Sequence, residues 1–295
     1  MSREVGVLRQ VGNSLHQILT KPHVPKARGM MRYVGWQGRR ALNLFPFEQR
    51  ISASRIVAAH RRCSVSALIY SQGLYDYDNM QLIQWLLREG GVFWDVGANI
   101  GSYTLVASEP DVASVVSFEP HPGTFQILAQ NVEMNHRRNV QLFNLALGPT
   151  EDVVFLSNEQ GSSTNCIEER PSHQTVPVPC RPARAFCTDP QLRPQYVKID
   201  VEGYEYDVLV GFAEWLPTIE LLMIEINGLS DSRGCGQDLI DHFLADRGFS
   251  GPWRCDFDHR VLLPLKQPHT EDAIYFSAPF RQRAQVRGLA IAEGL

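Results

Sequence analysis

Acidic side chains stand at the ends of three short apolar segments of this sequence. Asp95 lies near the end of segment 92–96, Glu119 follows segment 114–118, and Asp200 closes segment 196–200. Apolar runs of this length, bounded by turn-forming residues, predict strands that are buried on both faces of a parallel sheet. Ligands of such sheets bind outside the carboxyl ends of the strands, so we expect the three carboxylates to face one common site.

A glycine-containing turn, Asp95–Gly101 (DVGANIG), closes the first of these segments. Its glycines permit a tight change of direction and a close approach of a ligand to the backbone. The helix expected after it, over 102–109, adds N–H groups and a positive dipole end that suit a carboxylate or a phosphate. Glu119 lies 24 positions after Asp95, near the spacing of about 20 residues at which an acid meets ribose hydroxyls. This pattern predicts a site for a nucleoside cofactor.

The turn differs from a dinucleotide-binding loop in two respects. Three residues other than glycine separate Gly97 from Gly101, so the middle glycine of G-x-G-x-x-G is missing. The carboxylate of Asp95 would repel a pyrophosphate but attract the ammonium or sulfonium group of S-adenosyl-L-methionine. We therefore expect S-adenosyl-L-methionine as the cofactor, and an NAD- or nucleotide-sugar-dependent Rossmann enzyme is the alternative. A non-catalytic binding module is a third possibility, which the three intact acids disfavour.

Strands and helices alternate along the chain around these motifs. Expected helices span 78–89, 102–109, 122–135, 204–212 and 236–247, and expected strands span 92–96, 114–118, 140–147, 153–156, 196–200, 219–226 and 273–276. This alternation predicts an α/β fold of three layers with a mostly parallel sheet. We divide the chain into a basic, partly helical extension at 1–62, a domain at 63–280 that carries the site, and a C-terminal tail at 281–295.

The motifs resemble those of a known family. Segments 94–101 (WDVGANIG), 118–120 (FEP) and 197–205 (VKIDVEGYE) are together similar to the FkbM-type family of class I methyltransferases, over about 74–276. The resemblance implies a Rossmann-like, seven-stranded, mostly parallel sheet with a reversed last strand and helices on both faces. It also implies S-adenosyl-L-methionine as methyl donor and a hydroxyl of a sugar or another natural product as acceptor.

The same resemblance assigns cofactor contacts to individual positions. The turn would face the methionine moiety, Glu119 the ribose, Pro120 and His121 the adenosine pocket, and Asn144 the adenine. The expected cofactor-binding residues are Asp95, Gly97, Ala98, Asn99, Gly101, Thr104, Glu119, Pro120, Asn144 and Asp200.

Methyl transfer to a hydroxyl needs alignment of the reacting groups and a group that takes the hydroxyl proton. Asp200 or Glu202 is expected to serve as this general base, Glu225 to assist, and Asn227 to orient the acceptor. The alternatives are structural: Glu202 would cap the following helix, and Lys198 would only pair with an acid. Several acids at one strand end could hold a divalent ion, but no spacing demands one, so we expect no metal.

Composition and charge limit the partners that this protein is expected to bind. Positions 1–62 hold twelve Lys or Arg and two Asp or Glu, although the whole chain has a net charge of −4. Such a segment suits an anionic partner (nucleic acid, a membrane surface or an acidic polysaccharide) or packs on its own acidic body. We expect the second, and we expect no nucleic-acid partner.

Apolar residues at 8, 11, 15, 18 and 19 recur at helical spacing in this extension. The sequence shows no signal-peptide core, no apolar run of about 18 residues and no paired-cysteine motif, which predicts a cytoplasmic protein with reduced thiols. The oligomeric state cannot be read from the sequence, and a dimer is compatible with it.

Overall fold

The computed structural model describes residues 23–61, 63–158, 165–168, 170–186, 189–226, 230, 235–266 and 272–292. The chain forms two compact units, 1–77 with 160–163 and 78–159 with 164–295. Within the described residues, no helix is both long and apolar enough to span a membrane. The expected helix over positions 8–19 lies outside the described residues.

The first unit is built around aromatic side chains. Its described elements are helix α2 (Lys26–Ala41), strands β1 (Phe47–Arg50) and β2 (Ile56–Ala59), which pair antiparallel, and helix α3 (Ser64–Gln72). Trp36 of α2 is buried and contacts the rings of Phe45, Phe47 and Tyr70. These ring contacts hold α2 against the hairpin and α3.

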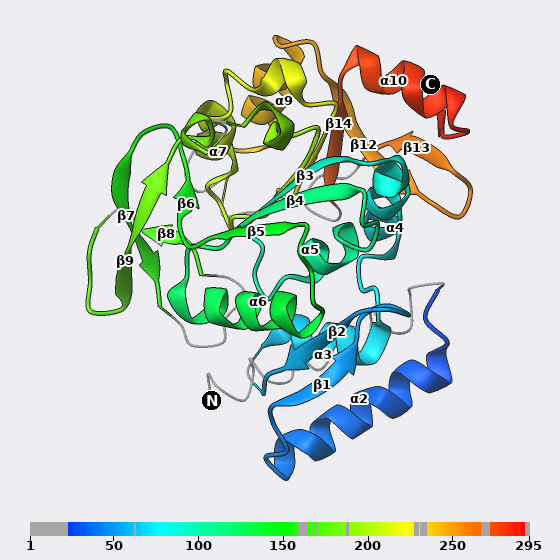
Figure 1. The fold of residues 1–295 in the computed structure, drawn as a ribbon, viewed down its shortest axis with the longest axis vertical. Helices are drawn as coiled ribbons and strands as arrows, with labels where there is room; N and C mark the ends of the chain where they lie inside the picture. Colours follow the sequence, from blue (N-terminus) through cyan, green and yellow to red (C-terminus); the bar gives the residue numbers. More distant parts are fainter. Residues whose placement is uncertain are drawn as a thin grey trace. The chain divides into compact units, whose positions relative to one another are not determined.

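The second unit contains the large sheet (Figure 1). Its strands, in spatial order, are β15 (Ala290–Ile291), β13 (Val261–Pro264), β12 (Ser250–Asp256), β14 (Ala273–Phe276), β11 (Leu221–Ile224), β10 (Tyr196–Ile199), β3 (Gly91–Val96), β4 (Ala113–Phe118) and β5 (Val140–Phe143). The five strands from β11 to β5 are parallel to their neighbours. Strand β14 runs antiparallel to both β11 and β12.

The expected mostly parallel sheet and the reversed strand at 273–276 are therefore confirmed, but the expected count of seven strands is wrong. The described residues form nine strands in this sheet. The difference arises beyond β14, where β12 continues through an antiparallel pairing to β13, which pairs with β15. Strand β15 has only two residues, and so short a segment carries no recognisable pattern.

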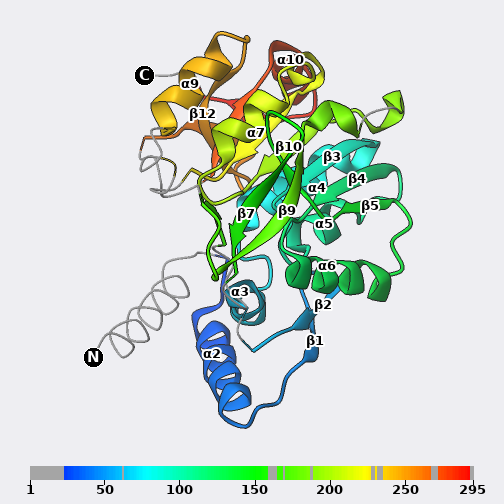
Figure 2. The same ribbon diagram turned by 90° about the vertical axis from the view of Figure 1, so that its left-hand side faces the viewer.

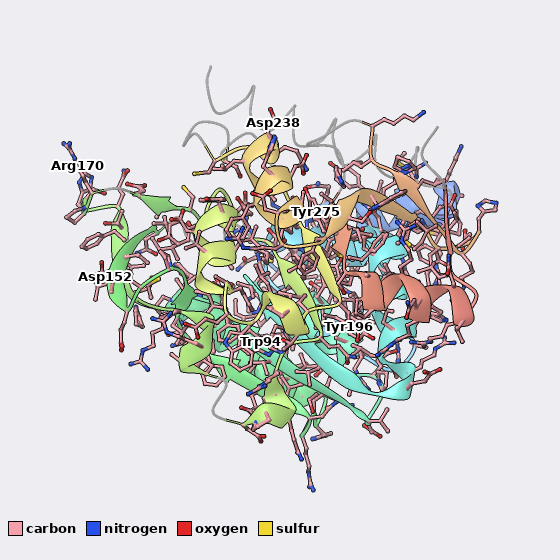
Figure 3. All side chains as sticks on the ribbon, turned by 90° about the horizontal axis from the view of Figure 1, so that it is seen from above. Trp94, Asp152, Arg170, Tyr196, Asp238 and Tyr275 are labelled. Atoms are coloured by element: carbon pink, nitrogen blue, oxygen red, sulfur yellow. The ribbon has the colours of Figure 1, made fainter. Side chains whose placement is uncertain are left out.

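Helices cover both faces of this sheet, as Figures 1 and 2 show. They are α4 (Tyr77–Leu86), continued by the 3-10 turn η1 (Leu87–Glu89), α5 (Ser102–Ala107), α6 (Pro122–Met134), α7 (Glu205–Gly211), α9 (Gln237–Ala245) and α10 (Ala278–Val286). Alternate strand residues such as Trp94 and Ile199 pack with Val208 of α7 and with Phe212, the residue that follows this helix, in one core. The side chains between them, Asp95 among these, point to the opposite face and meet α5. Figure 3 shows Trp94, Tyr196 and Tyr275 among the strands of this sheet.

The expected single strand over 140–147 is divided between two sheets. Residues 140–143 form β5, whereas β6 (Ala146–Leu147) pairs with β9 (Thr175–Arg181) in a small sheet completed by β7 (Asp152–Ser157) and β8 (Ile167–Glu168). The chain leaves the large sheet at Asn144, whose amide donates to the carbonyls of Glu119 and Pro120 instead of extending the strand. The apolar pattern continued through this break and could not show it.

The boundaries of the expected helices agree with the structure to within a few residues. Asp78, expected to cap the first helix, lies inside its first turn, and its carboxylate accepts from the N–H of Phe257. Segment 278–286 forms α10, so helix extends into the region expected to be a tail. Further 3-10 turns are η2 (Ala183–Ala185), η3 (Pro190–Leu192) and η4 (Leu216–Thr218).

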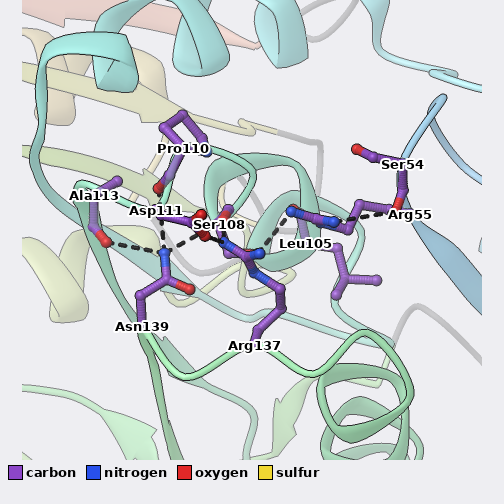
Figure 4. A network of polar contacts seen from close by, with 9 residues as sticks. All are labelled: Ser54, Arg55, Leu105, Ser108, Pro110, Asp111, Ala113, Arg137 and Asn139. Atoms are coloured by element: carbon purple, nitrogen blue, oxygen red, sulfur yellow. Dashed lines mark hydrogen bonds and ion pairs between the residues drawn. The ribbon is translucent and has the colours of Figure 1, made fainter.

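A polar network fixes the return from α5 to β4 (Figure 4). The Arg137 guanidinium donates to the carbonyl of Ser108 and pairs with Asp111 at 2.8 Å. The Asn139 amide donates to the carbonyls of Ser108, Pro110 and Ala113 at 3.3, 3.3 and 2.9 Å. These contacts hold segment 108–113, which joins α5 to β4, against the residues that connect α6 to β5.

Candidate active site

The carboxyl ends of four parallel strands stand side by side. In the strand register Asp95 is opposite both Ser117 and Lys198, and Lys198 is opposite Met223. The pairing continues one residue past the strands, since the Asp200 N–H donates to Val96 at 2.9 Å and the Glu225 N–H to Ile199 at 3.0 Å. The structure therefore brings Asp95, near the end of β3, and the acids that follow β4, β10 and β11 to one edge, as the sequence predicts.

The turn after β3 uses all five of its own N–H groups inside the protein. Those of residues 97 and 98 donate to the carbonyl of Phe118, both at 2.9 Å, and that of residue 101 donates to Ala98 at 2.9 Å. The N–H of Asn99 donates to the Glu119 carboxylate at 2.9 Å, and that of Ile100 to the Asn99 side chain at 2.8 Å. A pyrophosphate needs free N–H donors, and residues 97–101 retain none.

Both glycines of the turn are required by its geometry. Gly97 has a φ of 83°, and a Cβ there would lie 1.8 Å from the carbonyl oxygen of Asp200. Gly101 has a φ of 91°, and a Cβ there would lie 2.6 Å from Leu128. Asn99, between them, also adopts a left-handed conformation with a φ of 51°, which asparagine tolerates better than most residues. The turn is thus packed directly against the end of β10.

Glu119 is a buried carboxylate held by two backbone donors. One oxygen accepts from the N–H of Asn99 at 2.9 Å and the other from the N–H of His121 at 2.8 Å. Burial raises the pKa of Glu119 to about 7, although these two hydrogen bonds oppose the shift. Since a carboxylate oxygen can accept more than one hydrogen bond, each oxygen keeps capacity for a ligand hydroxyl.

The neighbours of Glu119 shape the loop after β4. The amide of Asn144 donates to the carbonyls of Glu119 and Pro120 at 2.8 and 3.0 Å. His121 caps α6, since its Nδ1 accepts from the N–H of Thr124 at 3.2 Å. Asn144 and His121, placed near the cofactor by the family resemblance, therefore support the main chain that presents Glu119.

Asp95 lies in β3, two residues before Gly97 of the turn. Its carboxylate accepts from the Thr104 hydroxyl at 2.6 Å, and that hydroxyl also contacts the Ser117 hydroxyl at 2.8 Å. Burial raises the pKa of Asp95 to about 6, against the opposing influence of Thr104 and Lys198. The structure joins two predicted cofactor residues, Asp95 and Thr104, in a chain of hydrogen bonds that ties α5 to β3 and β4.

Asp200 belongs to a charged cluster at the end of β10. Its carboxylate contacts the Lys198 ammonium at 2.7 Å, and 32% of its side chain stays exposed, whereas Lys198 is buried. Burial alone would raise the pKa of Asp200, but Lys198 and a hydrogen bond from Glu225 together lower it. The negative charge of Asp200 and burial raise the pKa of Glu225 to about 10. At neutral pH the pair thus carries one proton, which resides on Glu225.

Two acids of this region were not predicted from the sequence. Asp272 lies 4.0 Å from the Lys198 ammonium and accepts from the Asn79 amide at 3.5 Å. Glu205 is buried, and its carboxylate accepts from the Gly203 N–H at 2.9 Å and from the Ser230 hydroxyl at 2.6 Å. A lysine inside an otherwise apolar strand signals a buried acidic partner, and this signal could have indicated more than one acid.

Two residues expected near the acceptor remain, Glu202 and Asn227, and the structure describes only the first. Glu202 lies at a bend with a φ of 52°, and α7 begins three residues later at Glu205, so the first-turn acids of this helix are Glu205 and Asp207. Asn227 lies outside the described residues. Among the described residues, no three His, Cys, Asp or Glu side chains gather as a metal site.

Comparison with known proteins decides the family. The model of the methyltransferase FkbM domain matches residues 95–250, more than half of the chain. This protein belongs to the FkbM methyltransferase family. The match begins at Asp95 and ends at Ser250, the first residue of β12, so it contains every site residue that the sequence predicted.

Two curated proteins resemble this FkbM family member over part of their length. The hexuronic acid methyltransferase AglP of Haloferax volcanii is 26% identical over 170 residues, and methyltransferase 1 of Beauveria bassiana is 29% identical over 164 residues. These alignments cover 54% and 48% of this chain and 65% of each relative. The chain thus spans just under two thirds of the length of both relatives.

Among solved structures, the tRNA (uracil-54, C5)-methyltransferase of Pyrococcus abyssi, in complex with S-adenosyl-L-homocysteine, is 12% identical with a TM-score of 0.41. The similarity covers 78% of this chain and 43% of that one.

Proposed function

We propose that this FkbM family member transfers a methyl group from S-adenosyl-L-methionine to a hydroxyl group of a sugar. The observation that carries the proposal is the partly exposed, ionised carboxylate of Asp200, a residue whose backbone carbonyl lies against Gly97 of the turn. It offers a proton acceptor beside the segment expected to face the methyl donor. Family membership supports methyl transfer as the reaction class.

The site residues fit this donor better than a dinucleotide. Glu119, with spare acceptor capacity on both oxygens, suits the two ribose hydroxyls that the donor and NAD share. The N–H groups of residues 97–101 are already paired, which disfavours a pyrophosphate at this turn. An ammonium group needs acceptors instead of donors, and backbone carbonyls and carboxylates supply them at this edge.

In the proposed reaction the bound donor supplies an electrophilic methyl group on a sulfonium. Asp200 accepts a hydrogen bond from the acceptor hydroxyl and orients its oxygen. As the oxygen–methyl bond forms and the sulfur–methyl bond breaks, the hydroxyl proton passes to Asp200. Such proton transfer contributes typically ~10²–10⁴-fold to the rate. Asp200 is exposed enough to receive an acceptor, which buried Asp95 is not.

Lys198 and Glu225 are proposed as positioning residues for Asp200. Lys198 keeps Asp200 ionised, and Glu225, which retains its proton at neutral pH, donates a hydrogen bond to it. We therefore propose Glu225 as a hydrogen-bond donor and not as the assisting base. Glu202 stays a proposed second base, since it lies at the bend that follows Asp200 by two residues.

A uronic acid is the first acceptor class to test, because one relative is named as a hexuronic acid methyltransferase. Such a sugar offers both hydroxyls and a carboxylate. Methylation of a carboxylate needs no base, whereas methylation of a hydroxyl does. The accessible base at Asp200 favours the hydroxyl.

The test combines binding with product analysis. Calorimetry of the purified protein should show binding of S-adenosyl-L-methionine and S-adenosyl-L-homocysteine and none of NAD. Methyl-labelled donor and a panel of hexoses and uronic acids should then give a product whose label survives mild alkali, as an ether does and a methyl ester does not. Binding of NAD alone would refute the cofactor, and an alkali-labile product would refute the hydroxyl acceptor.

A further inference from the structure

Helix α2 of the first unit carries an apolar stripe on its outward side. Residues 27, 31, 34, 38 and 41 recur at intervals of four and three, so they lie on one face of the helix. All five are exposed, and they are Ala27, Met31, Val34, Gly38 and Ala41. The opposite face holds buried Gly29 and Trp36, the latter inside the aromatic cluster. A helix anchored by its inner face should present polar residues outward, and α2 does not.

The stripe contains large and accessible apolar side chains. Met31 is 70% exposed and Val34 63%, and beyond the end of the helix Leu42 and Leu44 are 72% and 51% exposed. A Cβ built at Gly38 would meet no described atom within 4 Å. Within the described residues, the face is therefore open along the middle of the helix.

The charges of α2 all have one sign. The helix contains five cations and no acid, in a chain with an excess of acidic residues. These cations lie outside the stripe, at Lys26, Arg28, Arg32, Arg39 and Arg40. A helix with an apolar face, bordered by lysine and arginine, suits the boundary between the headgroups and acyl chains of an anionic bilayer.

We propose that α2 docks on an anionic lipid surface, with Met31 and Val34 inserted among the lipids and the flanking cations at the headgroups. A bilayer accounts for both features of the helix, since the apolar stripe enters the acyl boundary and the cations pair with phosphates. At 16 residues, α2 would be about 24 Å long and lie flat in the interface without crossing it. The proposed activity at Asp200 does not depend on this docking.

The direct test is sedimentation of the full-length protein with vesicles of phosphatidylglycerol and phosphatidylcholine in equal parts, and with vesicles of phosphatidylcholine alone. The protein should sediment with the anionic vesicles and not with the neutral ones. Binding should be lost at about 1 M salt, where the Debye length is about 3 Å. A protein that stays in the supernatant with anionic vesicles would overturn the proposal.

Substitutions in α2 test whether this helix is the part of the protein that binds the vesicles. Met31→Glu combined with Val34→Glu should weaken vesicle binding by about tenfold or more, since each added charge opposes an anionic surface. The matched control is Val112→Glu with Val286→Glu, which makes the same changes at two exposed valines elsewhere in the chain. The control should bind like the wild type. Equal binding of the two double variants would refute the assignment to α2.

A gain-of-function variant guards against misfolding as an explanation. Gly38→Leu extends the stripe into open space and should tighten vesicle binding. All variants should keep the far-UV circular dichroism and the methyl transfer of the wild type. A different outcome would overturn the lipid proposal: the wild type does not bind vesicles but forms a dimer, and the Met31→Glu, Val34→Glu variant is a monomer. The stripe would then be an interface between two copies of the chain.

Discussion

Replacement of Glu119 by glutamine should lower the stability of the protein at pH 5 and have a smaller or reversed effect at pH 8. Burial raises the pKa of Glu119 from 4.5 to about 7, so the folded protein binds its proton more tightly than the unfolded chain does. The resulting contribution to the free energy of unfolding is fully present below pH 4.5 and is lost as the pH rises through 7. Glutamine has no such proton, so Glu119→Gln removes this dependence.

The magnitude follows from the two pKa values. Between pH 5 and pH 8 the contribution of Glu119 falls by about 2.5 kcal/mol. Glutamine also turns its NH₂ group toward one of the backbone donors, Asn99 or His121, at a cost of about 1–3 kcal/mol at every pH. The variant should therefore be about 1–3 kcal/mol less stable than the wild type at pH 5, and between about 1.5 kcal/mol more stable and about 0.5 kcal/mol less stable at pH 8.

Urea denaturation of the ligand-free wild type and variant at both pH values measures this difference. Glu133→Gln, on the exposed surface of α6, controls for the loss of a surface carboxylate. S-Adenosyl-L-methionine should bind the Glu119→Gln variant about tenfold or more weakly at pH 8, because hydrogen bonds to a charged acceptor are lost. A stability difference that is the same at pH 5 and pH 8 would refute the burial argument, whatever the effect on binding.

Four further substitutions, at three positions, test Asp200 and its neighbours. Asp200→Asn should lower kcat by about 10²–10⁴-fold and change the donor Kd little, as measured by steady-state kinetics and calorimetry; unchanged turnover would remove Asp200 from the reaction. Glu225→Gln, a neutral donor of similar shape, should keep kcat within about tenfold of the wild type, while Glu225→Ala loses more; equal losses would argue that Glu225 acts as a base. Gly97→Ala should destabilise the protein by more than about 3 kcal/mol in urea, since its Cβ would collide with the Asp200 carbonyl.

Much of the fold could be predicted because its strands are buried on both faces. Segment 273–276 is a continuous apolar run and segment 92–96 is interrupted only by Asp95, and the structure places strands there with at most one residue of difference. The break at Asn144 could not be predicted, because it depends on carbonyls 24 and 25 positions earlier in the chain. Pattern alone reports the burial of a segment and not the sheet to which it belongs.

The site, like the fold, could be predicted only in part. Residue type and position after a strand were enough to place Glu119 and Asp200 at one edge. The buried network around them was not readable, since Asp272 comes from the reversed strand region, distant in sequence from Lys198. Nor could charge states be read, because the proton on Glu225 depends on the proximity of Asp200.

The fully paired turn at 97–101 has a consequence for product release. A loop that lends its N–H groups to a ligand must find new partners for them when the ligand leaves. This turn has its partners in Phe118, Ala98, Asn99 and Glu119 within the protein. If the turn holds the proposed cofactor, exchange of the spent cofactor for a fresh one therefore requires no new partners for these N–H groups.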